Sequence, residues 1–214
     1  MRVAGGAWRG RPLVAPTGRG TRPTSDKVRE AIFDVLQALP ELREAAASAS
    51  PAGADATSPG GAVSGAPAMS GPLAGHAVLD LYAGSGALGI EALSRGAARC
   101  TFVERERAAL AALRRNLAAV GATAPATRIV ATDVRRALQA DARAGCMYTL
   151  VLADPPYARS ADAQDALTRS LGPVLAPQAV IVVETSGEED VVLPWRQVRV
   201  KVYGGTKVVV LAAG

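Results

Sequence analysis

Hydrophobic and polar positions change period regularly along the chain, and this predicts alternating strands and helices. Four short apolar runs have the length of buried strands, and between them apolar residues recur every three or four positions, as in amphipathic helices. Buried strands that alternate with helices are typical of a mostly parallel sheet with helices on both faces. The four runs lie at residues 78–81, 98–104, 128–133 and 148–153.

The two ends of the chain add further elements. An apolar stripe from Val28 to Leu39 predicts an N-terminal helix. After the fourth strand we predict a helix at about 161–175 and a buried strand at 179–184. Strands 198–203 and 207–211, joined by a Gly-Gly-Thr turn, then form a hairpin, which makes the last strand antiparallel to the others.

A glycine-rich turn follows the first core strand. Gly84 and Gly86 let the backbone approach a ligand closely, and the N-terminus of the next helix supplies N–H groups. Gly84-x-Gly86-x-x-Gly89 matches the dinucleotide fingerprint, so NAD is one candidate ligand. Asp80 favours another, because a carboxylate there repels a pyrophosphate but attracts the cationic end of S-adenosylmethionine (SAM).

Acidic residues also end the second and third predicted strands. Glu104 can accept hydrogen bonds from both ribose hydroxyls of NAD or SAM, and Asp133 can meet the adenine amino group of SAM. Each residue taken singly is equally well explained as a solvated helix cap. Two acids at consecutive strand ends beside a glycine turn favour a binding site.

The tetrapeptide Asp154-Pro155-Pro156-Tyr157 ends the fourth strand. Neither proline has an N–H, so the loop offers acceptors, namely the Asp154 carboxylate and the backbone carbonyls. Tyr157 adds an aromatic face. This combination suits a planar base with an exocyclic amine, whose lone pair Asp154 and the Pro155 carbonyl could orient toward a methyl donor. The alternative is a proline-rich loop with an ordinary aspartate cap.

These motifs together resemble the RsmD family of small-subunit rRNA guanine-N2 methyltransferases, within the class I SAM-dependent superfamily. The segments that carry the resemblance are 5–11, 22–30, 80–95 and 154–157. The resemblance implies an α/β fold, with a Rossmann-like, mostly parallel sheet, an antiparallel last strand and a small N-terminal extension. It also implies methyl transfer from SAM, with S-adenosylhomocysteine (SAH) as product, to N2 of a guanine in 16S rRNA, guanine 966 in the family.

The resemblance further implies the partners and the site residues. The partner is 16S rRNA, the small ribosomal subunit or an assembly intermediate, and the enzyme is expected to be a cytoplasmic monomer. The catalytic residues are expected to be Asp154, Pro155 and Tyr157. The cofactor residues are expected to be Asp80, Tyr82, Ala83, Gly84, Ser85, Gly86, Gly89, Glu104, Asp133, Val134 and Asp154.

Positive charge is concentrated at the N-terminus. The chain has 24 basic and 19 acidic residues, and residues 1–29 hold seven of the basic residues but one acid. A basic segment that contains a tryptophan and leads into a helix predicts contacts with RNA phosphates; a solvated tail is the alternative. The predicted RNA-binding residues are Arg2, Trp8, Arg9, Arg11, Arg22, Thr24, Lys27 and Arg29.

Composition divides the chain into three parts and excludes some functions. We predict an RNA-contacting arm and helix at 1–44, a flexible insertion at 45–75, where Ala, Ser, Gly and Pro fill 26 of 31 positions, and a methyltransferase core at 76–214. One histidine and two cysteines predict neither a metal site nor a disulfide. No apolar run has membrane length.

Three alternative functions stay open at this point. A DNA adenine-N6 methyltransferase shares the acidic Pro-Pro-aromatic loop, although we find no dedicated DNA-reading domain. An NAD-dependent oxidoreductase shares the glycine turn, but Asp80 and the terminal hairpin oppose it. A non-catalytic RNA-binding module is opposed by the complete set of acids at the strand ends.

Overall fold

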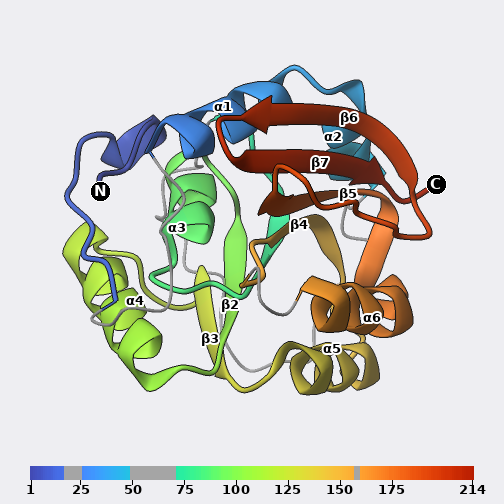
Figure 1. The fold of residues 1–214 in the computed structure, drawn as a ribbon. Helices are drawn as coiled ribbons and strands as arrows, with labels where there is room; N and C mark the ends of the chain where they lie inside the picture. The colour runs from blue at the N-terminus through green and yellow to red at the C-terminus, as the bar shows by residue number, and fades with distance from the viewer. Residues whose placement is uncertain (17–25, 49–70, 157–159) are drawn as a thin grey trace.

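A seven-stranded sheet forms the centre of the molecule (Figure 1). The computed structural model describes residues 1–16, 26–48, 71–156 and 160–214. The strand order is β3-β2-β1-β4-β5-β7-β6. The strands are β1 (Ala77–Leu81), β2 (Arg99–Glu104), β3 (Thr127–Ala131), β4 (Tyr148–Ala153), β5 (Leu175–Ser186), β6 (Arg196–Tyr203) and β7 (Thr206–Ala212).

Strand direction confirms the predicted fold class. The first five strands pair in parallel, and β7 pairs antiparallel with both β5 and β6. The sheet is therefore mostly parallel, and its C-terminal hairpin folds back so that the last strand lies beside β5. No helix in the described ranges is long and apolar enough to span a membrane.

Helices cover both faces of the sheet. Apolar side chains of α1, α2, α3 and α4 form one hydrophobic cluster, and those of α5 and α6 form a second cluster on the other face. Alternate residues of the central strands feed the two clusters, so β1 and β4 are buried along their whole length. The helices are α1 (Asp26–Gln37), α2 (Pro40–Ser48), α3 (Ala87–Ser94), α4 (Arg107–Val120), α5 (Val134–Arg143) and α6 (Ser160–Ser170), with 3-10 turns η1 (Gly6–Trp8) and η3 (Gly172–Val174).

The predicted insertion at 45–75 is too long at both ends. Helix α2 continues to Ser48, and Ala45 is fully buried. The chain is again packed before residue 76, because Leu73 is fully buried and its N–H donates to the Arg95 carbonyl at 3.2 Å. The part between, residues 49–70, lies outside the described residues.

Two predicted helices also end earlier than expected. The helix predicted to reach Leu39 ends at Gln37, and Leu39 lies in the short connection before Pro40, which starts α2. The helix predicted to reach residue 175 ends at Ser170. Strand β5 then begins at Leu175, four residues before the predicted strand, and its pairing with β4 shifts between Tyr148 and Leu150.

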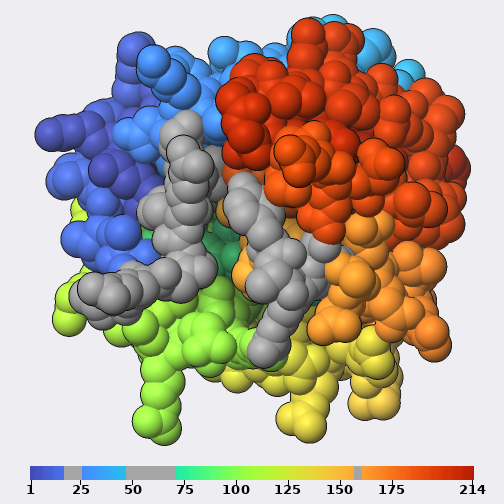
Figure 2. Space-filling model, viewed as in Figure 1, coloured from blue at the N-terminus to red at the C-terminus, as the bar shows by residue number. Residues whose placement is uncertain are grey.

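The N-terminal arm, residues 1–16, packs on the core and is not a separate unit. Arg2 forms a β-bridge with Pro12, and Val3 and Leu13 are buried. In the space-filling view the arm (dark blue) lies directly against the green surface of α4 (Figure 2). The arm is therefore held in a defined position relative to the helices that follow β1 and β2.

Candidate cofactor and substrate site

The predicted cofactor and catalytic residues gather where the parallel strands end. Residue pairing places Leu81 of β1 beside Val103 of β2 on one side and Ala153 of β4 on the other. The loops that follow these three strands therefore leave the sheet at one edge. The chain passes to opposite sides of the sheet after β1 and β4, and ligands of open α/β sheets bind at such a switch point.

The glycine turn has the backbone shape that its sequence predicts. Gly84 and Gly86 have φ angles of 56° and 80°, in the left-handed region. A Cβ at Gly86 would come within 2.3 Å of Leu113 Cδ1 on α4, and its positive φ would strain any other residue. A Cβ at Gly84 would meet only the Tyr82 carbonyl oxygen among the described residues, at 3.9 Å. Among the described residues, the turn is therefore packed on one side and open on the other.

Glu104 holds this turn from the second strand. Its Oε2 accepts a hydrogen bond from Gly84 N–H at 2.8 Å, and its Oε1 accepts from the N–H groups of Arg105 and Glu106 at 2.7 and 2.8 Å. The residue is 9% exposed. A carboxylate has about four acceptor positions, so three backbone bonds leave one for a ligand hydroxyl.

Asp80 lies beneath the turn. It is 1% exposed, and its Oδ2 accepts a hydrogen bond from Gly89 N–H at 2.9 Å. Burial raises the pKa of Asp80 to about 8, the Gly89 hydrogen bond partly opposes this, and the negative charges of Asp154 and Glu104 add to it. The three carboxyl groups are thus close enough to repel one another.

Tyr82 joins the end of β1 to the turn in a strained conformation. It has a φ of 58° without being glycine, which is rare for an aromatic residue. Burial raises the pKa of Tyr82 to about 12, while nearby Asp133 raises it and Arg105 lowers it. Its side chain packs against the hydrophobic cluster of α5 and α6.

Asp133 and Val134 follow β3. The Oδ1 of Asp133 accepts a hydrogen bond from Arg136 N–H at 3.0 Å, so this residue caps α5. Its side chain is 38% exposed. Val134 is buried in the cluster beneath α5 and α6. Oδ1 is enough for the cap, and Oδ2 lies 3.4 Å from the exposed Arg136 Nε, so an adenine amine would compete only with this surface ion pair.

The Asp154 loop begins directly after β4. Asp154 is half-buried, and its N–H points to the Leu81 carbonyl at 3.5 Å. Pro155 is buried and Pro156 is exposed. The predicted stacking residue Tyr157 lies outside the described residues. Pairing of Leu81 with Ala153 places Asp154 beside the end of β1, and its negative charge raises the pKa of Asp80.

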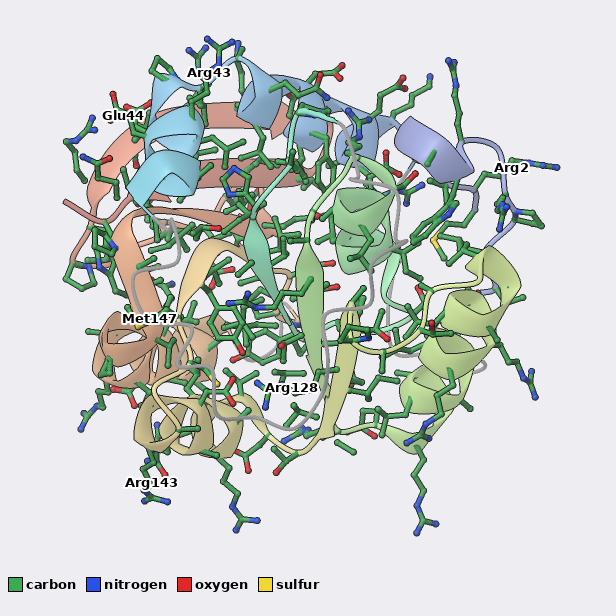
Figure 3. All side chains as sticks on the ribbon, turned by 180° about the vertical axis from the view of Figure 1, so that it is seen from behind. Arg2, Arg43, Glu44, Arg128, Arg143 and Met147 are labelled. Carbon is green, nitrogen blue, oxygen red and sulfur yellow. The ribbon has the colours of Figure 1, made fainter. Side chains whose placement is uncertain are left out.

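The predicted RNA-binding residues differ in position. Arg2, Arg9, Arg11 and Lys27 are exposed, and Arg2 lies at the outer rim of the molecule in Figure 3. Trp8 is half-buried and packs against the hydrophobic cluster under α1. Two further predicted residues, Arg22 and Thr24, lie outside the described residues.

The prediction that Arg29 contacts RNA is wrong. Arg29 is completely buried, and its Nε lies 3.5 Å from Glu91 Oε2. Its Nη2 donates to Asp26 Oδ1 at 2.9 Å and to the carbonyl of Arg2. This guanidinium is therefore a structural ion partner inside the protein, where no phosphate can reach it.

Two polar residues of this region were not predicted. Glu91 is fully buried and accepts hydrogen bonds from the N–H groups of Ala4 and Gly5, both at 2.8 Å, and from Arg95 Nε at 2.8 Å. Asn116 on α4 is 1% exposed. The four-residue spacing between Glu91 and Arg95 was a signal for an ion pair, whereas nothing local distinguished Asn116.

The sheet order, the antiparallel β7 and the glycine turn after β1 define a Rossmann-like methyltransferase fold. The family model described as "Conserved hypothetical protein 95" matches residues 1–58 and 65–212. Ribosomal RNA small subunit methyltransferase D of Escherichia coli K12 is 34% identical over 207 residues, which cover 95% of this chain and 85% of that protein. The chain therefore belongs to the RsmD family, as its motifs predicted.

Solved structures share this fold. A hypothetical protein of Thermus thermophilus aligns with a TM-score of 0.73 and 25% identity over 100% of this chain and 99% of its own. The SAM-dependent methyltransferase of Agrobacterium tumefaciens, at 16% identity, shares the fold alone, with a TM-score of 0.51 over 64% of this chain and 56% of its own. Family membership favours a methyltransferase over the NAD-dependent oxidoreductase.

Proposed function

We propose that this protein transfers a methyl group from SAM to the exocyclic N2 amine of a guanine in 16S rRNA. The observation that carries the proposal is the convergence of Asp80, Glu104 and Asp154 around an open glycine turn at the strand ends. Membership in the RsmD family supports rRNA as the substrate.

The chemistry of the site fits SAM. Within the described part of the chain, no salt bridge engages Asp80 or Glu104, so both carboxyl groups are available to a cationic cofactor. Asp80, whose pKa is raised to about 8, would ionise as the cation binds. SAM carries two positive groups, an ammonium and a sulfonium, whereas NAD carries a pyrophosphate that this site would repel. Glu104 would accept a hydrogen bond from one ribose hydroxyl with its remaining acceptor position, and Asp133 would hold the adenine amine.

The residues of this chain would position the target amine. When SAM is bound, its sulfonium supplies a reactive methyl group, so the protein needs no metal and no covalent nucleophile. The Asp154 carboxylate and the Pro155 carbonyl would accept hydrogen bonds from the amine, which localises its lone pair and directs it at the methyl group. Tyr157 would stack on a base that has left its helix.

The N-terminal arm would contact the RNA backbone. Arg2, Arg9 and Arg11 are exposed on a segment that is packed against α3 and α4, next to the turn. Fixed cations close to an active site place phosphates without reading sequence. The choice of guanine N2, and of position 966, rests on the family resemblance.

Nucleoside mass spectrometry tests this function. Unmodified 16S rRNA and reconstituted small subunits are incubated with the protein and SAM that carries a deuterated methyl group. We expect labelled N2-methylguanosine at one position. Asp154→Ala should slow methyl transfer by orders of magnitude and leave SAM affinity nearly unchanged, because the amine loses its acceptor. Asp162→Ala, which removes an exposed acid from the first turn of α6, is the matched control and should be active.

Two results would contradict the proposal. Labelled N6-methyladenosine in duplex DNA, with none in rRNA, would favour the DNA methyltransferase alternative. A wild-type rate for Asp154→Ala would show that this loop does not hold the amine.

A further inference from the structure

Asn116 connects the N-terminal arm to the glycine turn. Its Oδ1 accepts a hydrogen bond from Val14 N–H at 2.8 Å, and its Nδ2 donates to the Val14 carbonyl at 3.0 Å. The same Nδ2 donates its second hydrogen to the Ser85 carbonyl at 2.9 Å. Val14 is 102 positions away in sequence and Ser85 is 31 positions away.

Among the common side chains of this length, only the amide of asparagine can make all three of these hydrogen bonds. It pairs with Val14 as a neighbouring strand would, with one acceptor and one donor, and still has a second donor for Ser85. A carboxylate would face two carbonyl oxygens, and alanine would leave three backbone groups without their partner. The chemistry of Asn116 is therefore matched to this junction, in which the residue is 1% exposed.

The other described anchors of the arm do not touch the turn. Glu91 and Ser94 hold Ala4, Gly5 and Trp8 against α3, and Arg11 donates to the Val120 carbonyl at the end of α4. Ser85, in contrast, lies between the two left-handed glycines of the turn, and it is 7% exposed. Among these side-chain anchors of the described arm, the Asn116 amide alone joins the arm to the turn.

We propose that Asn116 is a positioning residue that couples cofactor binding to the placement of the basic arm. The inference rests on the proposed function for its cofactor. A ligand that fixes the turn also fixes the Ser85 carbonyl, and through the amide it fixes Val14, three residues after Arg11. By linkage, RNA held by the arm must then tighten cofactor binding by the same factor.

Hydrogen exchange on the full chain, with and without saturating SAH, tests the coupling without RNA or turnover. The Val14 amide donates to Asn116, so its exchange rate reports this junction directly. In the wild type we expect SAH to slow exchange in residues 84–89 and also in residues 12–16, by about fivefold or more if the coupling has the usual size. In the second segment the reporting amides are those of Leu13, Val14 and Ala15, because Pro12 and Pro16 have no N–H. Asn116→Ala should keep the first effect and lose the second.

Ser94→Ala is the matched control. It removes two bonds of the arm, from Ser94 Oγ to the Gly5 carbonyl at 2.6 Å and from Trp8 N–H to Ser94 Oγ at 2.9 Å, but leaves the turn untouched. The SAH effect on residues 12–16 should persist in this variant. If Asn116→Ala does not fold, the wild-type comparison alone still tests whether SAH binding is coupled to the arm, and its failure would overturn the proposal.

The outcomes separate this inference from the proposed function. Protection of the turn without protection of residues 12–16 in the wild type would overturn the coupling and leave the cofactor proposal intact. Equal protection of the arm in Asn116→Ala would remove Asn116 as the link. No protection of either segment would overturn the cofactor proposal, and this inference with it. A second measurement adds a 16S rRNA fragment. The fragment should lower the Kd for SAH in the wild type. In Asn116→Ala the Kd for SAH should be nearly the same with and without the fragment.

Discussion

The affinity for SAM should depend steeply on pH, because the carboxyl beneath the glycine turn is buried. The pKa of Asp80 is raised to about 8 without ligand, and a bound cation favours its ionised form. At pH 6 about 1% of this carboxyl is ionised, and at pH 8 about half is ionised. If SAM lowers the pKa below 6, affinity should rise about 50-fold from pH 6 to pH 8, which corresponds to about 2.3 kcal/mol.

Asp80→Asn isolates this effect. The amide oxygen can still accept the hydrogen bond from Gly89, but the side chain stays neutral. The Kd for SAM should then be nearly independent of pH and should resemble that of the wild type at pH 6. Isothermal titration calorimetry at pH 6, 7 and 8, in buffers of different ionisation enthalpy, measures both the Kd and the protons released. Asp133→Asn removes a more exposed acid and should keep the wild-type slope. A flat wild-type profile would refute the reasoning, and so would an unchanged slope in Asp80→Asn.

The raised pKa of Asp80 also determines how the stability of the free protein changes with pH. The folded-state pKa of Asp80 lies above its unfolded value, so its favourable contribution is complete below about pH 4 and is lost as pH rises through about 8. Without ligand, Asp80→Asn should therefore melt at a higher temperature than the wild type at pH 8.5, and the difference should shrink at pH 5.5. The ionised form of Asp80 thus favours cofactor binding but lowers the stability of the free protein.

Two further substitutions test the supports of the site. Glu104→Ala should weaken SAM binding by about 1.5–3 kcal/mol, because it removes a charge-assisted acceptor and also releases the N–H of Gly84. Calorimetry that shows an unchanged Kd would remove Glu104 from the cofactor site. Glu91→Ala should lower the free energy of unfolding in urea by about 3–5 kcal/mol, because it leaves the buried Arg29 and Arg95 without their shared carboxylate. The control is Asp34→Ala, which removes a mostly exposed partner of Arg95 and should cost less than about 1 kcal/mol; similar losses for both would contradict the buried-pair argument.

The core strands were predictable because strands buried on both faces leave continuous apolar runs. Residues 148–153 were predicted as a strand and form β4, and residues 207–211 lie within β7. The start of β5 was not predictable from this signal. Pro177 interrupts the run, and Gln178 adopts a φ of 59°, so the pairing with β4 shifts where the sequence looks like a loop.

Composition misjudged the edges of the insertion for a different reason. The predicted segment was bounded by counting small residues, and such a count ignores their spacing. Leu42 and Ala45 are three positions apart, and both are buried on one side of α2. Alanine favours a helix wherever a neighbour can cover it, so burial decided the structure where composition suggested a linker.

The acids of the site were predictable because each lies in the last two residues of a strand or just after it, and local sequence fixes that position. Contacts between residues that lie far apart in sequence were not predictable. Arg29 looked like part of a basic arm until Glu91, 62 positions later, was seen to pair with it inside the protein. Asn116 looked like an ordinary polar position on an amphipathic helix. Its two partners lie 102 and 31 residues away in sequence, so no local pattern indicated its role.

The two fixed ends of the low-complexity segment make this chain a suitable host for an inserted reporter. The chain leaves the described fold at Ser48, at the end of α2, and returns at Gly71, just before the buried Leu73. A Cβ at Gly71 would lie 2.3 Å from the Arg95 carbonyl oxygen, so this re-entry point accepts no larger residue. Between these points the free energy of loop closure changes by only about 0.6 kcal/mol for each doubling of length. A fluorescent label or an affinity tag placed within residues 49–70 should therefore leave the sheet, the turn and the Asn116 junction in place.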